Sequence, residues 1–179
     1  MAPQPAPISW TNVAHDDASH TLFQKILLAT DGTVTELLSL YCGQRVSARK
    51  LVQTTSQDPS PAAMRAGIVP PLLLRTVLLV SAEGCPLLHA ASCFALDAMP
   101  EPIRRDLLQT DLPIGLLWRR ERLEMYREIL GCQRGSAPAI ASVLQVASDA
   151  TLLRRNYRLI HHGQPMGWIE ETFATSTLQ

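Results

Sequence analysis

The sequence predicts an α+β domain in which helices pack on an antiparallel sheet. Two hairpin patterns lead to this prediction. The apolar run at 72–80 is followed, after a short polar turn, by a second apolar run at 86–96. The runs at 151–161 and 165–175 form a second such pair near the C-terminus. The length of 179 residues fits a single domain, since domains typically contain roughly 100–200 residues.

Two helices are expected before the first hairpin. The first begins near Thr21, and its apolar face would comprise Leu22, Phe23, Ile26 and Leu27. The second begins with a capping box formed by Thr33 and Glu36 and ends at Gly43. Its apolar side would comprise Leu37, Leu38, Leu40 and Tyr41.

The rest of the chain divides into shorter pieces. We expect a strand at 45–55, a helix at 99–110, a turn at 111–115, a strand at 123–130 and a short helix at 138–146. Residues 56–70, with three prolines, are expected to be irregular except for one helical turn near 62–66. This segment is a candidate for a mobile cover over a binding site.

The N-terminal residues 1–18 are rich in Pro, Ala and Asp, so we expect a flexible arm before a domain at 19–179. The first ten residues lack the basic and apolar regions of a signal peptide. The sequence contains no run of 18 uncharged apolar residues, so no membrane span is predicted. The four cysteines are widely spaced and form no CxxC pair, which favours reduced thiols in a cytoplasmic protein.

Charge excludes some partners. The 16 basic and 16 acidic residues give zero formal net charge, which argues against nucleic acid, whose backbone is bound by many Lys and Arg side chains. Fourteen of the basic residues are arginines and two are lysines. Arginine presents a planar fork that matches a carboxylate. Most of these arginines are expected at the surface, and the informative ones are those in apolar segments.

Arg75 is such a residue, because it lies in the middle of an apolar strand. A charged group there must reach solvent, an ionic partner or a ligand, since an unpaired buried charge costs several kcal/mol. One interpretation is an exposed position on the polar face of the strand. The other is an arginine directed into a pocket for an anionic ligand.

Glu170 and Glu171 are adjacent in the last predicted strand and must therefore face opposite ways. If one points inward among apolar side chains, burial would raise its pKa and suit it to proton transfer. The alternative is a surface strand with two solvated acids.

Other motifs are weak. His161 and His162 would point apart in a hairpin turn, and no third ligand is near in the sequence, so a metal site is not expected. There is no GxSxG, P-loop or GxGxxG motif, so neither a serine hydrolase nor a nucleotide cofactor is expected. The turns at 31–33 and 113–115 can offer backbone N–H groups to an anion.

In their order, these features resemble the chorismate lyase (chorismate–pyruvate lyase) family, in particular its divergent branch in photosynthetic prokaryotes and mycobacteria. The resemblance spans about residues 22–174. It is carried by four segments: Asp31-Gly32-Thr33-Val34-Thr35-Glu36, Leu74-Arg75-Thr76-Val77-Leu78-Leu79, Leu112-Pro113-Ile114-Gly115, and Arg154-Arg155-Asn156-Tyr157-Arg158-Leu159 continuing through Gly163-Gln164-Pro165 to Glu171-Thr172-Phe173.

The resemblance implies a small antiparallel sheet with an enclosed ligand site. It also implies a reaction without cofactor that releases pyruvate from chorismate and leaves 4-hydroxybenzoate, with a role in quinone synthesis. In this family an arginine matching Arg75 binds the ring carboxylate, assisted by backbone amides that match Ile114 and Val34 in the turns containing Gly115 and Thr33. A glutamate matching Glu171 faces the ring hydroxyl.

Some assignments stay open within this resemblance. The last hairpin is one residue longer than expected, and counting from Pro165 would select Glu170, whereas keeping Phe173 in its place selects Glu171. The glutamate can act as a general acid toward the ether oxygen or can manage the proton at the ring carbon. A second arginine or further backbone amides could hold the enolpyruvyl carboxylate, and Arg155 and Arg158 are weak candidates for that arginine.

Two other functions fit the same sequence. Effector-binding domains of some bacterial transcription regulators share this fold and bind small acids without chemistry. A lyase that makes another hydroxybenzoate isomer is the second alternative.

Overall fold

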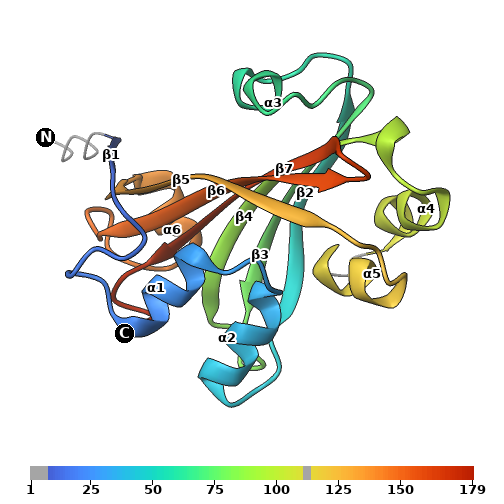
Figure 1. The fold of residues 1–179 in the computed structure, drawn as a ribbon. Coiled ribbons are helices and arrows are strands. Elements are labelled where there is room, and N and C mark those ends of the chain that lie inside the picture. Colours follow the sequence, from blue (N-terminus) through green and yellow to red (C-terminus); the bar gives the residue numbers. More distant parts are fainter. Residues whose placement is uncertain (1–7, 111–113) are drawn as a thin grey trace, which may run out of the picture.

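The computed structural model describes residues 8–110 and 114–179. Seven antiparallel strands form one sheet in the order β1-β5-β6-β7-β4-β3-β2 (Figure 1). The strands are β1 (Ser9–Asn12), β2 (Ser47–Ser56), β3 (Leu72–Val80), β4 (Pro86–Ala95), β5 (Tyr126–Ser136), β6 (Leu152–His161) and β7 (Gln164–Ala174). The predicted α+β class is confirmed.

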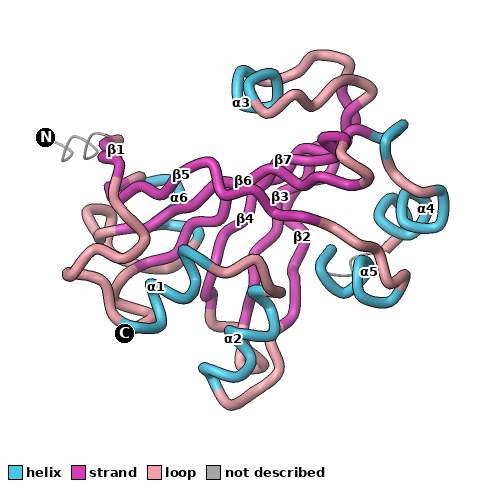
Figure 2. Tube along the Cα trace, in the orientation of Figure 1, coloured by secondary structure: helices cyan, strands magenta, loops and turns pink. Residues whose placement is uncertain are grey.

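The helices surround this sheet, which runs through the centre of the molecule in Figure 2. They are α1 (Leu22–Ala29), α2 (Val34–Cys42), α3 (Pro61–Arg65), α4 (Glu101–Gln109), α5 (Ile114–Arg120) and α6 (Pro138–Val143), with a 3-10 turn at Leu96–Ala98. In the described part of the chain, no helix has the length and apolar character needed to cross a membrane.

Both predicted hairpins are present, β3–β4 and β6–β7. They are joined side by side through antiparallel pairing of β4 with β7, in which Ala90 lies opposite Glu171. Because successive side chains of a strand point to opposite faces, this register places Arg75 and Glu171 on the same face of the sheet. The two sequence segments of greatest interest therefore meet through a pairing between distant parts of the chain.

The two faces of the sheet carry different helices. On one face, α1 and α2 pack with Leu88 and Phe173 in one core cluster, and α4 and α5 pack with Phe94 and Leu159 in a second cluster. On the opposite face, α3 packs near Cys93 and α6 packs near Leu78. The first face thus carries two pairs of helices, α1 with α2 and α4 with α5, and each pair packs on its own apolar cluster.

The helix caps differ from the prediction. Thr33 is the N-cap of α2, but its side chain makes no capping hydrogen bond. The capping box lies instead at α1, where the Thr21 hydroxyl accepts from the Gln24 N–H at 3.3 Å and the Gln24 side chain accepts from the Thr21 N–H at 3.1 Å. Gly43 ends α2 as expected, with a φ of 63° that favours glycine.

The apolar faces of α1 and α2 were assigned correctly only in part: Phe23, Leu27, Leu37 and Leu38 pack in the core cluster, but other residues of the predicted faces do not. Leu22 is 75% exposed and Leu40 is 79% exposed. In α1 an inward position is taken by Gln24, whose amide donates to the carbonyl oxygens of Thr175 and Leu178 at 3.1 and 2.8 Å. A polar side chain can occupy the core when its hydrogen bonds are satisfied, and apolar periodicity does not detect this.

Three other expectations need correction. Residues 1–18 are not a loose arm throughout, because Ser9–Asn12 form β1 and pair with β5. The strand expected at 123–130 is found at 126–136, where its polar second half is held by pairing with β1 and β6. The turn expected at 111–115 falls partly on residues 111–113, outside the described residues, and Ile114 and Gly115 begin α5.

The segment 56–70 contains α3 close to the predicted position, but it does not cover the face of the sheet that carries Arg75 and Glu171. Ala63 and Ile68 pack with Leu72 and Trp168 on the opposite face. Figure 1 shows α3 and α2 at opposite ends of the molecule. The prediction of a mobile cover over a site is therefore wrong in its location.

Candidate functional site

A cavity lies on the first face of the sheet, between the pair α1 and α2 and the pair α4 and α5. It is lined by side chains from both clusters and enclosed by α2 on one side and α5 on the other. The space is about 670 Å³, counting its opening to solvent. Its lining is mostly apolar: Ala48, Val77, Leu79, Ala90, Phe94, Trp118 and Ile169. Binding sites for small molecules combine such a lining with a few polar groups.

The structure brings all six predicted site residues to this cavity. Its lining includes Thr33, Val34, Arg75, Ile114, Gly115 and Glu171. They come from α2 and the residue before it, from β3, from the start of α5 and from β7. Their placement agrees with a common site, whereas the role of each one in catalysis or binding stays a prediction.

Arg75 is 3% exposed and lines the cavity from the middle of β3. The interpretation as an exposed surface arginine is therefore wrong. The Ser92 hydroxyl donates to the Arg75 carbonyl oxygen at 2.9 Å, which ties the backbone to β4 at this point. A guanidinium held in an apolar wall is suited to a carboxylate, which it can bind through two parallel hydrogen bonds.

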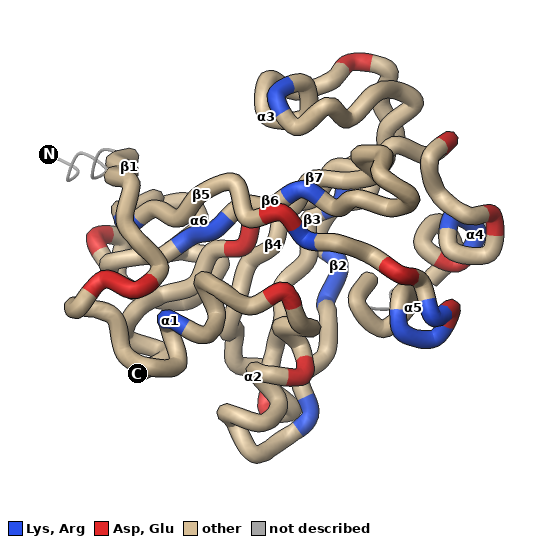
Figure 3. The backbone as a smooth tube through the Cα atoms, viewed as in Figure 1, with Lys and Arg blue, Asp and Glu red and all other residues tan. Residues whose placement is uncertain are grey.

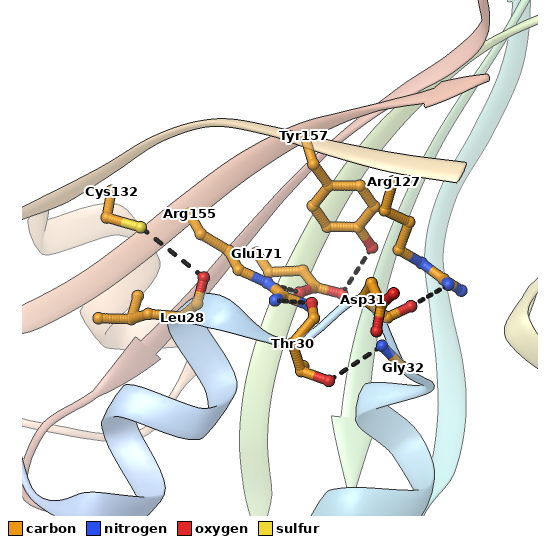
Figure 4. A network of polar contacts seen from close by, with 9 residues as sticks. All are labelled: Leu28, Thr30, Asp31, Gly32, Arg127, Cys132, Arg155, Tyr157 and Glu171. Atoms are coloured by element: carbon orange, nitrogen blue, oxygen red, sulfur yellow. Dashed lines mark hydrogen bonds and ion pairs between the residues drawn. The ribbon is translucent and has the colours of Figure 1, made fainter. Parts of the chain in front are cut away.

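Glu171 is 7% exposed and belongs to a buried polar network (Figure 4). Arg155 lies directly opposite it on β6, and its Nε donates to Glu171 Oε2 at 2.8 Å. The Tyr157 hydroxyl donates to the other carboxylate oxygen at 3.0 Å. Arg155 also donates through Nη1 to the Thr30 carbonyl oxygen at 2.6 Å, which connects the network to the turn before α2.

The charges in this network support one another. Burial and the neighbouring Glu171 carboxylate both raise the pKa of Tyr157, so its phenol stays neutral and donates a hydrogen bond. Burial is the largest single influence on the pKa of Arg155 and lowers it. The charge and hydrogen bond of Glu171, together with Tyr157 and Cys132, act in the opposite direction and leave this pKa above its usual value. The network therefore presents Glu171 as a hydrogen-bonded carboxylate at the cavity wall.

Glu170 is on the opposite face, where Arg154 Nη1 lies 3.3 Å from its Oε2. Burial raises the pKa of Glu170, and the charge of Arg154 counteracts this. Arg154 also stacks over the Trp10 ring, with its Cζ 3.9 Å from the ring centroid. Of the two glutamates, Glu171 is thus the one that lines the cavity.

The two candidates for a second carboxylate-binding arginine lie elsewhere. Arg155 is engaged by Glu171 and is absent from the described lining of the cavity. Arg158 pairs with Glu128, with its Nε 2.9 Å from Oε2, and it is likewise absent from the described lining. Neither is placed to bind a ligand in the cavity.

Arg127, which the sequence analysis did not select, lines the cavity from the start of β5. Its guanidinium donates through Nη1 to the Asp31 carbonyl oxygen (Figure 4). Alternation offered a signal, because Ile129, two residues further, packs in the core and predicts an inward Arg127.

Two helix starts contribute backbone groups. Val34 and Ile114 are the first residues of α2 and α5, where N–H groups have no partner within their own helix. A Cβ added to Gly115 would lie 3.0 Å from Thr33 Cγ2, so glycine lets these two helix starts approach closely. Val34 and Ile114, next to this close approach, both line the cavity.

The two adjacent histidines do not point apart as expected, since the ring centroids of His161 and His162 are 4.0 Å apart. The His161 Nδ1 is 2.9 Å from the Glu124 carbonyl oxygen. In the described residues, no group of three or more His, Cys, Asp or Glu side chains is arranged to hold a metal ion.

The chain is thus an α+β domain in which an antiparallel sheet and its helices border an apolar cavity whose described lining includes Arg75 and Arg127. A family model described as "Chorismate pyruvate-lyase Rv2949c-like" matches residues 28–179, and the chain belongs to this family.

One curated relative agrees with this assignment, and two solved structures share the fold. The chorismate pyruvate-lyase of Mycobacterium leprae is 27% identical over 161 residues, covering 87% of this chain and 75% of the relative. PhnF from Mycobacterium smegmatis has the same fold, with a TM-score of 0.66 at 12% identity over 84% of this chain and 67% of that one. A GntR-family transcriptional regulator from Bacillus cereus has a TM-score of 0.58 at 10% identity, over 75% of this chain and 94% of that one.

Proposed function

We propose that the protein is a chorismate lyase that converts chorismate to 4-hydroxybenzoate and pyruvate. The observation that carries the proposal is the burial of Arg75 and Glu171 in one apolar cavity, in a chain that belongs to a chorismate pyruvate-lyase family. The cationic group suits the ring carboxylate and the carboxylate suits the ring hydroxyl.

The spacing of these groups supports a six-membered ring between them. Arg75 is on β3 and Glu171 is on β7, with β4 between them. Two strand spacings separate their backbones by about 10 Å. The Arg75 and Glu171 side chains, extending from the same sheet face, can therefore reach opposite ends of a para-substituted ring that lies over Ala90 and Ser92.

The reaction needs little covalent chemistry from the protein. The bond between the ring and the ether oxygen breaks, the hydrogen on the neighbouring hydroxyl-bearing carbon is lost, and the new double bond completes the aromatic ring. The leaving group takes up a proton at its methylene carbon and becomes pyruvate. Aromatisation supplies the driving force, so the protein acts mainly by orienting chorismate and excluding water.

The role of Glu171 was left open between an acid and a proton acceptor. Its ion pair with Arg155 and its hydrogen bond from Tyr157 favour the acceptor, because both contacts are made to a carboxylate. We therefore expect Glu171 to accept the hydrogen bond of the ring hydroxyl and to stabilise the charge that develops on the carbon beside it.

An assay with chorismate tests the proposal. Purified protein at micromolar concentration should form 4-hydroxybenzoate, identified by chromatography, faster than chorismate decays on its own. Arg75→Ala is expected mainly to weaken substrate binding and Glu171→Gln mainly to lower turnover. Product formation at the spontaneous rate only would refute the activity. Wild-type kinetics in both variants would refute the site.

The likeness of the fold to a GntR-family regulator favours one alternative, a domain that binds a small acid without converting it. In that case 4-hydroxybenzoate would bind tightly and chorismate would stay intact. A lyase that makes another hydroxybenzoate isomer would be recognised by its product in the same chromatogram. Use of the product in quinone synthesis stays a prediction from the resemblance, and a cytoplasmic location stays a prediction from the spacing of the cysteines.

A further inference from the structure

We infer that Arg127 binds the second carboxylate of the substrate, the one that leaves with pyruvate. This inference rests on the proposed function for the identity of the substrate. Arg127 thereby becomes a residue that distinguishes the dianionic substrate from the monoanionic aromatic product. Arg75 would bind the ring carboxylate, which both molecules carry.

The position of Arg127 within the cavity supports this role. It lies at the start of β5 and extends past the Tyr157 ring toward Asp31, as Figure 4 shows. In the sheet, β5, β6 and β7 all lie on the same side of β4, so Arg127 borders the cavity from the side of the Tyr157–Glu171 hydrogen bond. Arg75 approaches from β3, at the other side of the sheet's central strands.

The covalent structure of chorismate makes the same distinction between its two ends. Its ether substituent is on the ring carbon next to the hydroxyl-bearing carbon, and its ring carboxylate is on the opposite side of the ring. A ligand with its hydroxyl at Glu171 and its ring carboxylate at Arg75 must therefore place the enolpyruvyl arm near Glu171. Arg127 is the cation at that end of the described lining.

The other charged groups of the cavity leave this role to Arg127. Among the described lining residues, Arg75 and Arg127 are the basic ones and Glu171 is the acidic one. Two cations and one paired carboxylate match a substrate with two carboxylates and a hydroxyl. The negative charge of Glu171 is already compensated by Arg155 behind it, so both lining arginines can serve the ligand.

The Asp31 contact positions the guanidinium. The carbonyl oxygen of Asp31 accepts from Nη1, and a guanidinium has five N–H donors in all. Asp31 belongs to the turn that also contains Thr33, whose side chain makes no cap bond to α2. An anion bound by Arg127 would therefore lie close to the start of α2, where the helix dipole also favours negative charge.

The test compares ligands with and without the second carboxylate. Calorimetric titration of Arg127→Met, Arg75→Met and the wild type would use 4-hydroxybenzoate and 3-(carboxymethoxy)-4-hydroxybenzoate, a stable dianion whose second carboxylate is on an ether arm beside the hydroxyl. Arg65→Met, an exposed substitution on α3 at the opposite face, is the control for the change in net charge. Steady-state kinetics with chorismate would be measured on the same four proteins.

We expect Arg127→Met to weaken binding of the dianion and to raise KM for chorismate, each by roughly 10- to 100-fold, which is the effect of losing one hydrogen bond to a charged group. The kcat for chorismate should change by less than about threefold. Its affinity for 4-hydroxybenzoate should stay within about threefold of wild type. Arg75→Met should weaken the binding of both ligands, whereas Arg65→Met should leave both affinities unchanged.

Equal loss of both ligands in Arg127→Met, or no loss of either, would overturn the inference about Arg127. Circular dichroism of each variant would separate misfolding from a loss of binding, and Arg127→Lys, which keeps the charge, should recover part of the dianion affinity. If Arg127→Met loses affinity for the dianion but not for 4-hydroxybenzoate, while the wild type leaves chorismate unconverted, the proposed activity fails and the second anion subsite stands.

Discussion

Two Arg–Glu pairs lie one residue apart on the same two strands and face opposite sides of the sheet. Arg155 and Glu171 are on the face of the sheet that carries the cavity, with side chains 1% and 9% exposed and an Nε–Oε2 distance of 2.8 Å. Arg154 and Glu170 face the other way, with side chains 20% and 21% exposed and an Nη1–Oε2 distance of 3.3 Å. The sequence of the two pairs is alike, and their surroundings differ.

The surroundings decide what each pair can do. The outer pair retains contact with solvent, where water screens the charges and an ion pair contributes little. The inner pair is cut off from water, so the loss of either partner leaves a charge without compensation. In addition, Glu171 borders the cavity and Glu170 does not. Charges also occur on elements throughout the chain, as Figure 3 shows, so the presence of a charged pair is not itself a sign of function.

The largest expected effect is on turnover. Glu171→Gln should lower kcat for chorismate by about 100- to 10,000-fold, the usual contribution of a group that manages a proton in the transition state. Glu170→Gln, the matched change on the opposite face, should leave kcat within about twofold. Parallel steady-state assays of the two variants check this. A comparable loss in both would contradict the assignment of the site to one face.

Removal of the two arginines should separate the pairs in stability. Arg155→Met leaves the Glu171 carboxylate buried without its counter-ion, and it should lower the free energy of unfolding by about 3–5 kcal/mol. Arg154→Met loses a partly exposed ion pair and the contact with Trp10, which together contribute about 1–2 kcal/mol. Urea denaturation followed by circular dichroism measures both. Equal losses would show that burial does not distinguish the pairs.

A smaller effect is expected at Tyr157. Tyr157→Phe keeps the ring but removes the donor to Glu171 Oε1, a hydrogen bond to a charged group that contributes about 1.5–3 kcal/mol. We expect kcat to fall about tenfold with a small change in KM, because the carboxylate is less well oriented. Kinetics of Tyr41→Phe, on α2, provide a control for loss of a hydroxyl. If kcat is unchanged in Tyr157→Phe, Tyr157 does not help to orient Glu171, and Arg155 alone has that role.

The smallest expected effect is on the pH dependence of stability, through His89 on the opposite face of the sheet. Burial lowers the pKa of His89 below its usual 6.5, so the folded protein keeps the ring neutral while the unfolded chain takes up a proton as the pH falls. The contribution of His89 to stability should therefore be constant above about pH 7 and decrease as the pH falls below the unfolded pKa. His89→Gln should flatten this dependence in urea titrations at pH 7 and 5. Burial lowers the pKa of His20 as well, so some slope should persist, whereas an unchanged slope would contradict the role of His89.

Local sequence patterns predicted much of the fold. The two hairpins and the helix at α4 were placed close to their observed ends, because alternating apolar residues and turn residues act over short distances. The strand Ser9–Asn12 was missed, because its residues are polar and its stability comes from pairing with β5. The inward position of Gln24 was missed for a similar reason, since its partners are carbonyl oxygens more than 150 residues away.

By itself the sequence determined that Arg75 stands in an apolar strand, and that Glu170 and Glu171 face opposite ways, because these facts follow from residue type and strand alternation. Only the tertiary structure decided which glutamate borders the cavity and that Arg127 joins it. The reason is that β3, β5 and β7 converge through pairings between distant segments. Which side of a strand is buried depends on what packs against it, and that information is not local.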